Sequence, residues 1–305
     1  MSALEPEVGR VERLVALRSF PGWSGLPTAE LATLAEAATP RSFDAGARLL
    51  EEGEPVTRTF MVVRGELALW RGGVELGRFG PHTGVGALAA FARDPRGYTV
   101  TAHQPSLVLE LHADDLTEIL EDRFIILLRM LQEMARENIR IRRTLGPSAG
   151  FPSHASAGEA CPAHRLDLME RIFLLRKNLA FVEGFIDSVA ALARDARELR
   201  LANGEVLWRI GDRADAMVAI ICGTIRGRTP EGFEFVLGAG DLVGGLDATA
   251  REPRWFQATV EEGLVGLAVD RDALVDVLED HPDLGMDLLR GFSVGLLSLL
   301  ERRAR

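Results

Sequence analysis

Cysteine and histidine side chains offer the most direct chemistry in this sequence, because they bind metals and act as nucleophiles or bases. Cys161 and His164 lie close together, with His154 upstream. A metal or haem site needs more ligands at regular spacing, so we expect no metal here. The remaining histidines are scattered and suggest no catalytic triad: His82, His103, His112 and His281.

Paired carboxylates are the second candidate for catalysis. Asp114-Asp115 and Glu121-Asp122 fall in a segment that reads as helical, where they are typical of helix-end or surface residues.

Gly84-Val85-Gly86 has glycine spacing found in dinucleotide loops, but no strand–helix–strand unit follows it. The sequence therefore predicts that this protein is not an enzyme.

Charge and hydropathy limit the partners. A formal net charge of −10 argues against a nucleic-acid-binding surface and against a polybasic membrane anchor. The apolar stretch from Leu284 to Leu300 is interrupted by Asp287 and Arg290, so we expect no membrane span. Lys177 is the only lysine, an arginine bias typical of a GC-rich bacterial genome.

Cysteine usage and the N-terminus bear on the compartment. Cys161 and Cys222 do not make a disulfide framework, and Cys222 lies in an apolar run (217–222) that we assign to the core. The N-terminus lacks the basic start and apolar run of a signal peptide. We therefore expect a cytoplasmic, reducing location.

The elements that must position any site occur twice. Gly46 and Gly204 are 158 positions apart, and so are Gly86 and Gly244. The same step relates further anchors without a gap: Gly53 and Gly211, Gly65 and Gly223, Gly80 and Gly238, Pro95-Arg96 and Pro253-Arg254, Leu120-Glu121-Asp122 and Leu278-Glu279-Asp280. Two copies of one turn framework predict two copies of one fold.

Each copy reads as a set of short strands followed by helices. Thr28 is a candidate N-cap of a short helix near the start. Apolar runs between turn signals then predict six strands and a helix in the first copy. These elements are the strands at 48–51, 59–63, 66–70, 74–79, 98–102 and 107–111 and the helix at 113–121.

A long helix with an apolar stripe is predicted to end each copy. The stripe could pack on its own barrel or pair with another helix, within the chain or between chains, and Asn138 could fix the register of such a pair. A homodimer and an intrachain pseudo-dimer both stay open. Gly291 and Gly295 weaken the second helix. The candidate pairing residues are Leu127, Leu131, Met134 and Asn138 in the first helix and Leu289, Phe292 and Leu296 in the second.

The stretch between the copies is rich in Gly, Pro, Ser and Ala, which is typical of a linker. We therefore divide the chain into a first domain at 1–144, a flexible linker at 145–165 and a second domain at 166–305.

The glycine pattern and the strand series resemble the cyclic-nucleotide-binding domain family, to which the catabolite activator protein and kinase regulatory subunits belong. The residues that carry the resemblance in the first copy are Phe43-Asp44-Ala45-Gly46, Glu52-Gly53-Glu54, Val63-Arg64-Gly65-Glu66-Leu67, Gly80-Pro81, Val85-Gly86-Ala87-Leu88-Ala89 and Asp94-Pro95-Arg96. The resemblance implies a mainly β fold with helices: two tandem jelly-roll β-barrels, each followed by a long C-terminal helix.

The resemblance also implies a phosphate-binding cassette. In the family, backbone N–H groups at a short helix and an arginine bind the cyclic phosphate, and a glutamate accepts a hydrogen bond from the ribose. Arg96 and Arg254 occupy the arginine position, with Gly86 in the cassette frame and Thr99 as a further donor. Both arginines could instead pair with a local carboxylate or cap a helix.

The sequence departs from that cassette in both copies. Ala87 and Gly245 stand at the glutamate position, so neither side chain can accept the ribose hydroxyl. Tyr98 replaces a small residue in the first copy, and Trp255 and Phe256 could fill the second pocket. We expect no cofactor, or at most a weakly bound cyclic nucleotide.

These departures favour a non-enzymatic regulatory or adaptor protein that acts through protein–protein interaction with an unidentified partner. The alternative is a sensor of a cyclic nucleotide or another anion through Arg96 and Thr99 of the first copy. The sequence stops at Arg305, directly after the second long helix, so we expect no DNA-reading module.

Overall fold

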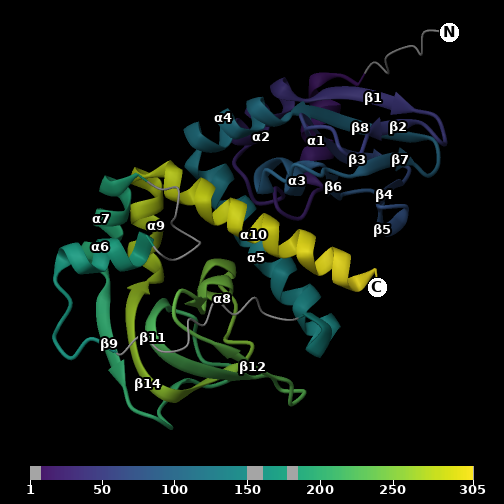
Figure 1. Ribbon diagram of the computed structural model, residues 1–305. Coiled ribbons are helices and arrows are strands. Elements are labelled where there is room, and N and C mark those ends of the chain that lie inside the picture. The colour runs from purple at the N-terminus through teal and green to yellow at the C-terminus, as the bar shows by residue number, and fades with distance from the viewer. Residues whose placement is uncertain (1–7, 150–160, 177–184, 305) are drawn as a thin grey trace. The chain divides into compact units, whose positions relative to one another are not determined.

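The computed structural model describes residues 8–149, 161–176 and 185–304 (Figure 1). Contacts divide the chain into two compact units. The first unit contains Met1–Glu133 and Phe292–Arg305, and the second contains Met134–Gly291. The end of the last helix therefore belongs to the unit built on the first copy.

The first copy is a sandwich of two four-stranded antiparallel sheets, drawn in purple to blue in Figure 1. One sheet has the order β1-β8-β3-β6 and the other β2-β7-β4-β5. Its elements are α1 (Arg10–Arg18), α2 (Thr28–Ala37), β1 (Thr39–Phe43), β2 (Arg48–Leu50), β3 (Arg58–Arg64), β4 (Leu67–Arg71), β5 (Val74–Phe79), β6 (Gly84–Val85), α3 (Ala87–Ala92), β7 (Thr99–Ala102), β8 (Ser106–His112), α4 (Ala113–Asp122), α5 (Phe124–Leu145) and the 3-10 turn η1 (Gly146–Ala149).

The second copy repeats this order, with two pairs of strands fused into long ones. The strand β11 spans the positions of β3 and β4, and β14 spans those of β7 and β8. Both long strands pair with each other throughout, in an antiparallel sheet of six strands. The elements are α6 (Leu168–Arg176), α7 (Ile186–Asp195), β9 (Arg197–Leu201), β10 (Val206–Trp208), β11 (Ala216–Arg228), β12 (Glu234–Leu237), β13 (Leu242–Val243), α8 (Gly245–Ala250), β14 (Gln257–Asp270), α9 (Arg271–Asp280) and α10 (Pro282–Arg303).

The expected strands and helices are confirmed, with ends shifted by one or two residues. Four short elements of the first copy were not predicted: β1, β6, α3 and η1. The strand β1 has the sequence TPRSF, which lacks the alternation of apolar residues that predicts a strand. In the structure none of its residues is fully buried. The predicted fold of two mainly β domains, each followed by a helix, is the fold observed.

The core of the first unit fills the space between its two sheets. Val62 of β3, Leu67 of β4 and Val100 of β7 are fully buried there, and Leu297 of α10 packs into the same cluster. Burying such side chains away from water is the main stabilising contribution to the sandwich.

The predicted stripe residues of the long helices are buried, apart from Phe292, which is half-buried. In α5, Asn138 donates from its side-chain amide to the Met134 carbonyl oxygen at 3.0 Å. Both packing alternatives agree with this burial, so helix pairing stays a prediction, as do the domain boundaries. The buried residues are Leu127, Leu131, Met134 and Asn138 in α5 and Leu289 and Leu296 in α10.

Glycines with positive φ form the turns shared by both copies. Gly65 (φ +90°) and Gly223 (φ +84°) are equivalent, and a side chain at either would collide with the neighbouring turn. At Gly223 the obstacle is the Gly263 carbonyl oxygen. Gly204 has the same backbone conformation (φ +85°), but open space lies where its side chain would be.

We expect Gly223→Ala to lower the free energy of unfolding by roughly 2–3 kcal/mol, because a left-handed conformation and a backbone collision both add cost. Gly204→Ala is the matched control and should cost only about 1 kcal/mol, from the conformation alone. Urea unfolding of both variants measures the difference. Equal losses would contradict the role given to the collision.

The expected N-cap role of Thr28 is wrong. Pro27 occupies the cap position of α2, and Thr28 is the first helical residue, with no side-chain hydrogen bond that caps the helix. Its hydroxyl oxygen instead accepts a hydrogen bond from the Arg18 guanidinium at 2.9 Å. Proline favours this boundary because its ring disfavours the helical conformation in the residue before it. A helix therefore rarely extends past a proline toward the N-terminus.

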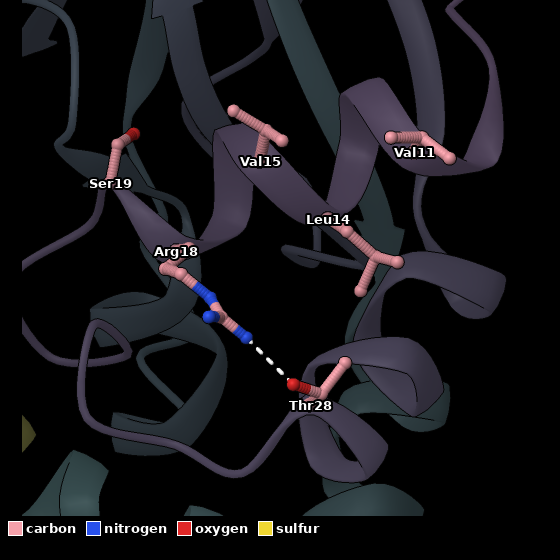
Figure 2. Close-up of a pocket in the computed structure, with 6 residues that line it drawn as sticks. All are labelled: Val11, Leu14, Val15, Arg18, Ser19 and Thr28. Atoms are coloured by element: carbon pink, nitrogen blue, oxygen red, sulfur yellow. Dashed lines mark hydrogen bonds between the residues drawn. The ribbon is translucent and has the colours of Figure 1, made fainter.

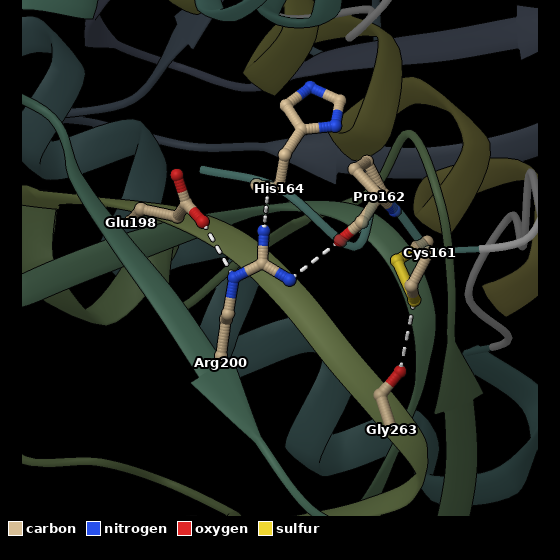
Figure 3. Close-up of a disulfide and its surroundings, with 7 residues drawn as sticks. Cys161, Pro162, His164, Glu198, Arg200 and Gly263 are labelled. Atoms are coloured by element: carbon tan, nitrogen blue, oxygen red, sulfur yellow. Dashed lines mark hydrogen bonds and ion pairs between the residues drawn. A yellow bond between two sulfur atoms is a disulfide. The ribbon is translucent and has the colours of Figure 1, made fainter. Parts of the chain in front are cut away.

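The expectation that Cys161 and Cys222 make no disulfide framework is also wrong. Cys161 and Cys222 form a disulfide with their Cα atoms 5.4 Å apart, although 61 positions separate them (Figure 3). Nearby, Arg200 donates to Glu198 at 2.7 Å and to the Pro162 carbonyl oxygen at 2.6 Å. These contacts attach the described end of the linker to the second barrel. Cys222 is buried, as predicted for a core residue.

Among the helices of the described residues, none combines the length and the apolar character needed to cross a lipid bilayer.

Candidate anion-binding positions in the two copies

A short helix opens the candidate site of each copy. In the first copy α3 begins directly after Gly86, whose φ is +101°. A side chain at Gly86 would come within 2.6 Å of the Arg58 carbonyl oxygen, so this close approach requires glycine. The first helical residue is Ala87, which brings no polar group to the site.

The Tyr98 side chain lies against the start of α3. It is only 2% exposed, and its oxygen accepts hydrogen bonds from the backbone N–H groups of Gly86 and Ala89. Burial raises the pKa of Tyr98 to about 12, although these bonds and the nearby Arg71 charge act in the opposite direction. The Arg71 guanidinium lies 5.7 Å from the centre of the Tyr98 ring. A neutral phenol therefore engages two of the amides at the start of α3.

The Arg96 side chain is exposed and paired with carboxylates. Its fractional exposure is 63%, and its Nε lies 3.4 Å from Asp94 Oδ1. Asp94 also accepts from the Arg96 backbone N–H at 3.0 Å and from Arg71 at 2.7 Å. Burial by itself would raise the pKa of Asp94, but these hydrogen bonds hold it below its ordinary value.

Arg71 is the buried member of this charge group. Its Nε and Nη2 donate to the Gly97 carbonyl oxygen at 3.0 and 2.6 Å. Its Nη1 donates to Glu301 near the end of α10, and Arg96 donates to the same Glu301 oxygen at 3.2 Å. Two arginines and two carboxylates thus share one site in the first unit.

Thr99 lies beside this group on β7. Its hydroxyl oxygen accepts a hydrogen bond from the Glu52 backbone N–H at 3.2 Å. The hydroxyl keeps its own proton to donate elsewhere.

In the second copy the equivalent arginine is buried. Arg254 is 4% exposed and lies 3.2 Å from Asp247 Oδ2, on the short helix α8. It donates to the Gly244 carbonyl oxygen at 3.2 Å and also to that of Ala216. Burial raises the pKa of Asp247 to about 6, while Arg254 acts to lower it.

A cluster of aromatic rings lies beside this buried ion pair. The Arg254 guanidinium lies 3.9 Å from the centre of the Trp208 ring, and Trp208 donates to the Phe256 carbonyl oxygen at 3.0 Å. Phe235 contacts both Trp255 and Phe256, with ring centres 6.0 and 5.0 Å apart. The first residue of α8 is Gly245, which adds no side chain.

The structure brings the expected residues of each copy together, but adds partners that sequence reasoning missed. In the first copy these are Arg71, Asp94 and Glu301, and in the second Trp208 and Asp247. Asp94 and Asp247 lie near the cassette residues in the sequence and could have been noticed there. No local signal links Arg71 to Glu301, which is 230 positions away.

Two other candidate sites carry no such arrangement. In the described part of the chain, no group of three or more His, Cys, Asp or Glu residues is suited to a metal ion, and His154 lies outside it. A pocket in the first unit is lined by residues of α1 and α2 and by Ser19, and Arg18 donates a hydrogen bond to Thr28 across it (Figure 2). It lies between α1 and α2 and includes none of the cassette residues.

Comparison with known proteins identifies the same family in both copies. Residues 40–123 and 198–281 each match the family model described as the cyclic nucleotide-binding domain. A CRP-like cAMP-activated global transcriptional regulator of Mycobacterium tuberculosis is 29% identical over 108 residues, which cover 34% of this chain and 48% of that protein. The chain thus spans about half the length of the curated relatives it matches.

Two solved structures illustrate the similarity. A regulatory subunit of a cAMP-independent protein kinase A from Trypanosoma brucei has 18% identity and a TM-score of 0.35, over 91% of this chain and 93% of its own. The N-terminal domain of a transcriptional regulator from Streptomyces coelicolor has 29% identity and a TM-score of 0.37, over 41% of this chain and 92% of its own.

Proposed function

Because the chain belongs to the cyclic nucleotide-binding domain family, with two copies of the domain, we propose that it is a regulatory protein whose two nucleotide pockets are closed by its own side chains. In this proposal it acts by binding a partner protein, as an adaptor, and catalyses no reaction. The curated relative named above is a regulator of transcription, which supports a regulatory role.

The position of Tyr98 is the observation that carries the proposal. The Gly86 and Ala89 amides at the start of α3 are the groups that would face an anion, and the Tyr98 oxygen already accepts from both. A ligand would have to displace a ring that is 2% exposed. Two amides at the start of α3 are therefore already engaged by the Tyr98 side chain.

The second copy supports the same conclusion in a different way. Arg254 is committed to Asp247 and to two carbonyl oxygens, and Trp255 and Phe256 are buried beside it. Using Arg254 for a ligand would leave the Asp247 carboxylate buried without its counterion, which costs several kcal/mol.

Neither copy supplies the ribose contact. Ala87 and Gly245 have no side-chain acceptor. A ribose hydroxyl bound there would lose its hydrogen bonds to water and gain no side-chain acceptor in return. That loss costs on the order of 1–3 kcal/mol, or roughly ten- to hundredfold in affinity.

Titration calorimetry with cyclic AMP and cyclic GMP tests the closed pockets. We expect no binding heat from the native chain at concentrations where a micromolar ligand would saturate it. The cAMP-activated regulator of Mycobacterium tuberculosis serves as the positive control for the ligand preparation. Micromolar or tighter binding to this chain would overturn the proposal.

The partner is expected to be a protein rather than a nucleic acid, because the net charge is −10. We expect its binding to be unchanged by added cyclic nucleotide. The cytoplasm is the proposed location, and there the Cys161–Cys222 pair would be kept mostly reduced.

A second candidate function rests on the exposure of Arg96. Its side chain is 63% exposed, so an anion in solution can reach it, and Thr99 still has a proton to donate. In this alternative the first copy senses a cyclic nucleotide or another anion. Arg96→Ala would then abolish a thermal shift that the ligand produces in the native chain, and the alternative fails if no ligand produces one.

A further inference from the structure

The last turns of α10 bring a carboxylate to the arginines of the first copy. One Glu301 oxygen accepts from Arg71 and, at 3.2 Å, from the exposed Arg96. Arginine pairs with carboxylates and phosphates through the same N–H groups. Glu301 therefore occupies the donors that an incoming anion would use.

The charges around Glu301 balance. Arg71 is 8% exposed and Asp94 is 12% exposed, so both are largely removed from water. Two carboxylates accompany two arginines there, with Glu301 as the second negative charge. Removing that charge would leave the buried Arg71 with Asp94 as its one acidic partner among the ion pairs described here, which is unfavourable in a poorly solvated site.

An apolar contact anchors the same helix segment. Leu297 lies one turn before Glu301 and is 5% exposed, in the core cluster that also contains Val85 and Tyr98. The Arg303 side chain lies beside Gly77 of β5. The end of α10 is thus held on the first barrel by a buried leucine and by an ion pair.

The equivalent end of α5 carries the opposite charge. Position 143, which corresponds to Glu301 in the repeat, is an arginine, and its charge acts on Glu231 within the second unit. In that unit Thr229 replaces Arg71, and Arg254 is committed to Asp247. Each helix end therefore matches the charges of the unit that holds it, although the sequence repeat would have allowed identical ends.

We propose that Glu301 is a built-in occupant of the anion position in the first copy, a carboxylate latch that holds the end of α10 on the first barrel. An anion that reaches Arg96 competes with this latch and loosens the helix end. The proposal deepens the proposed function and rests on it, since the native chain keeps the position for its own side chain.

Hydrogen–deuterium exchange of residues 292–303 in Glu301→Gln tests the latch without any ligand. The amide cannot supply the negative charge, so we expect exchange of this segment to be at least about tenfold faster than in the native chain. Glu261→Gln is the matched control, because Glu261 pairs with Arg226 at 2.7 Å in the second unit. Native-like exchange in Glu301→Gln would overturn the proposal.

Arg96→Gln tests the same pair from the other side, at an exposed position where folding is not at risk. It should speed exchange of the same segment by less than Glu301→Gln, because Arg71 still holds the carboxylate. In the double variant the two effects should not add, since one interaction cannot be lost twice. Full additivity would contradict the pairing.

Calorimetry with cyclic AMP and with inorganic phosphate tests the competition and separates the two anion sources. We expect Glu301→Gln to bind at least one of them about tenfold more tightly than the native chain, and unchanged affinity for both would refute the competition. Micromolar binding of cyclic AMP to the native chain would overturn the proposed function, while the exchange experiment would still decide on the latch.

Discussion

Replacing Tyr98 by alanine should lower the free energy of unfolding by about 3–5 kcal/mol, which is the range for removing a large buried aromatic side chain. Tyr98 is 2% exposed and packs in the core cluster with Val85 and Val100. The truncation also leaves the Gly86 and Ala89 N–H groups without the phenol oxygen. Urea unfolding followed by circular dichroism measures the loss.

Tyr98→Phe is the control that keeps the ring and removes only the hydroxyl. We expect a loss of about 1–3 kcal/mol, because two buried N–H groups lose their acceptor while the packing remains. If the proposed pocket closure is right, the alanine variant opens space beside α3 and the phenylalanine variant does not. Equal stability losses in the two variants would contradict the packing role of the ring.

Replacing Arg254 by alanine should cost about 3–5 kcal/mol at neutral pH, because it leaves the Asp247 carboxylate buried without its counterion. The variant also loses the contact of the guanidinium with the Trp208 ring. Arg226→Ala is the matched control: Arg226 pairs with Glu261 but is 49% exposed, and exposed pairs contribute less than about 1 kcal/mol. A similar loss in both variants would contradict the importance of burial.

The stability loss caused by Arg254→Ala should also depend on pH, because Asp247 titrates. Burial raises the pKa of Asp247 from its ordinary 3.8 to about 6, so between these values the folded protein binds a proton that the unfolded chain does not. This contribution to stability is fully present below about pH 4 and is lost as the pH rises through 6. It amounts to about 3 kcal/mol at about 1.4 kcal/mol per pKa unit.

Arg254→Ala should therefore be much less destabilising at pH 5 than at pH 7.5, because at pH 5 Asp247 takes up a proton and no longer carries a buried charge without a counterion. Unfolding curves at the two pH values check this. A loss that is independent of pH would mean that the packing of Arg254 against Trp208, rather than its charge, stabilises the second copy.

The repeat and the strand pattern were predictable from the sequence because they depend on local requirements. Gly65 and Gly223 adopt positive φ at equivalent turns, and this requirement alone makes glycine recur at one spacing. Apolar runs between such turns became β3, β4 and β8 because alternate side chains must leave water. The strand β1 was not predicted in this way, because few of its residues are apolar.

The sequence also located the cassette positions, but it did not show whether their side chains are exposed or buried. Arg96 and Arg254 stand at equivalent positions, yet the Arg96 side chain is 63% exposed and the Arg254 side chain, which lies against the Trp208 ring, is only 4% exposed. The difference depends on neighbours: Asp247 and Trp208 enclose Arg254, whereas Arg96 lies at the surface. Burial of a charge is decided by what packs around it.

Sequence alone determined that this chain is one β-rich domain written twice, because turns, strands and helices follow from local residue patterns. Only the tertiary structure decided that Tyr98 covers the amides of α3, that Cys161 meets Cys222 and that Glu301 reaches Arg71. For the two cysteines and for Glu301 the physical reason is separation along the chain, because contacts between residues 61 or 230 positions apart leave no periodic signal. For Tyr98 the reason is packing, because the direction of its side chain is set by the core around it.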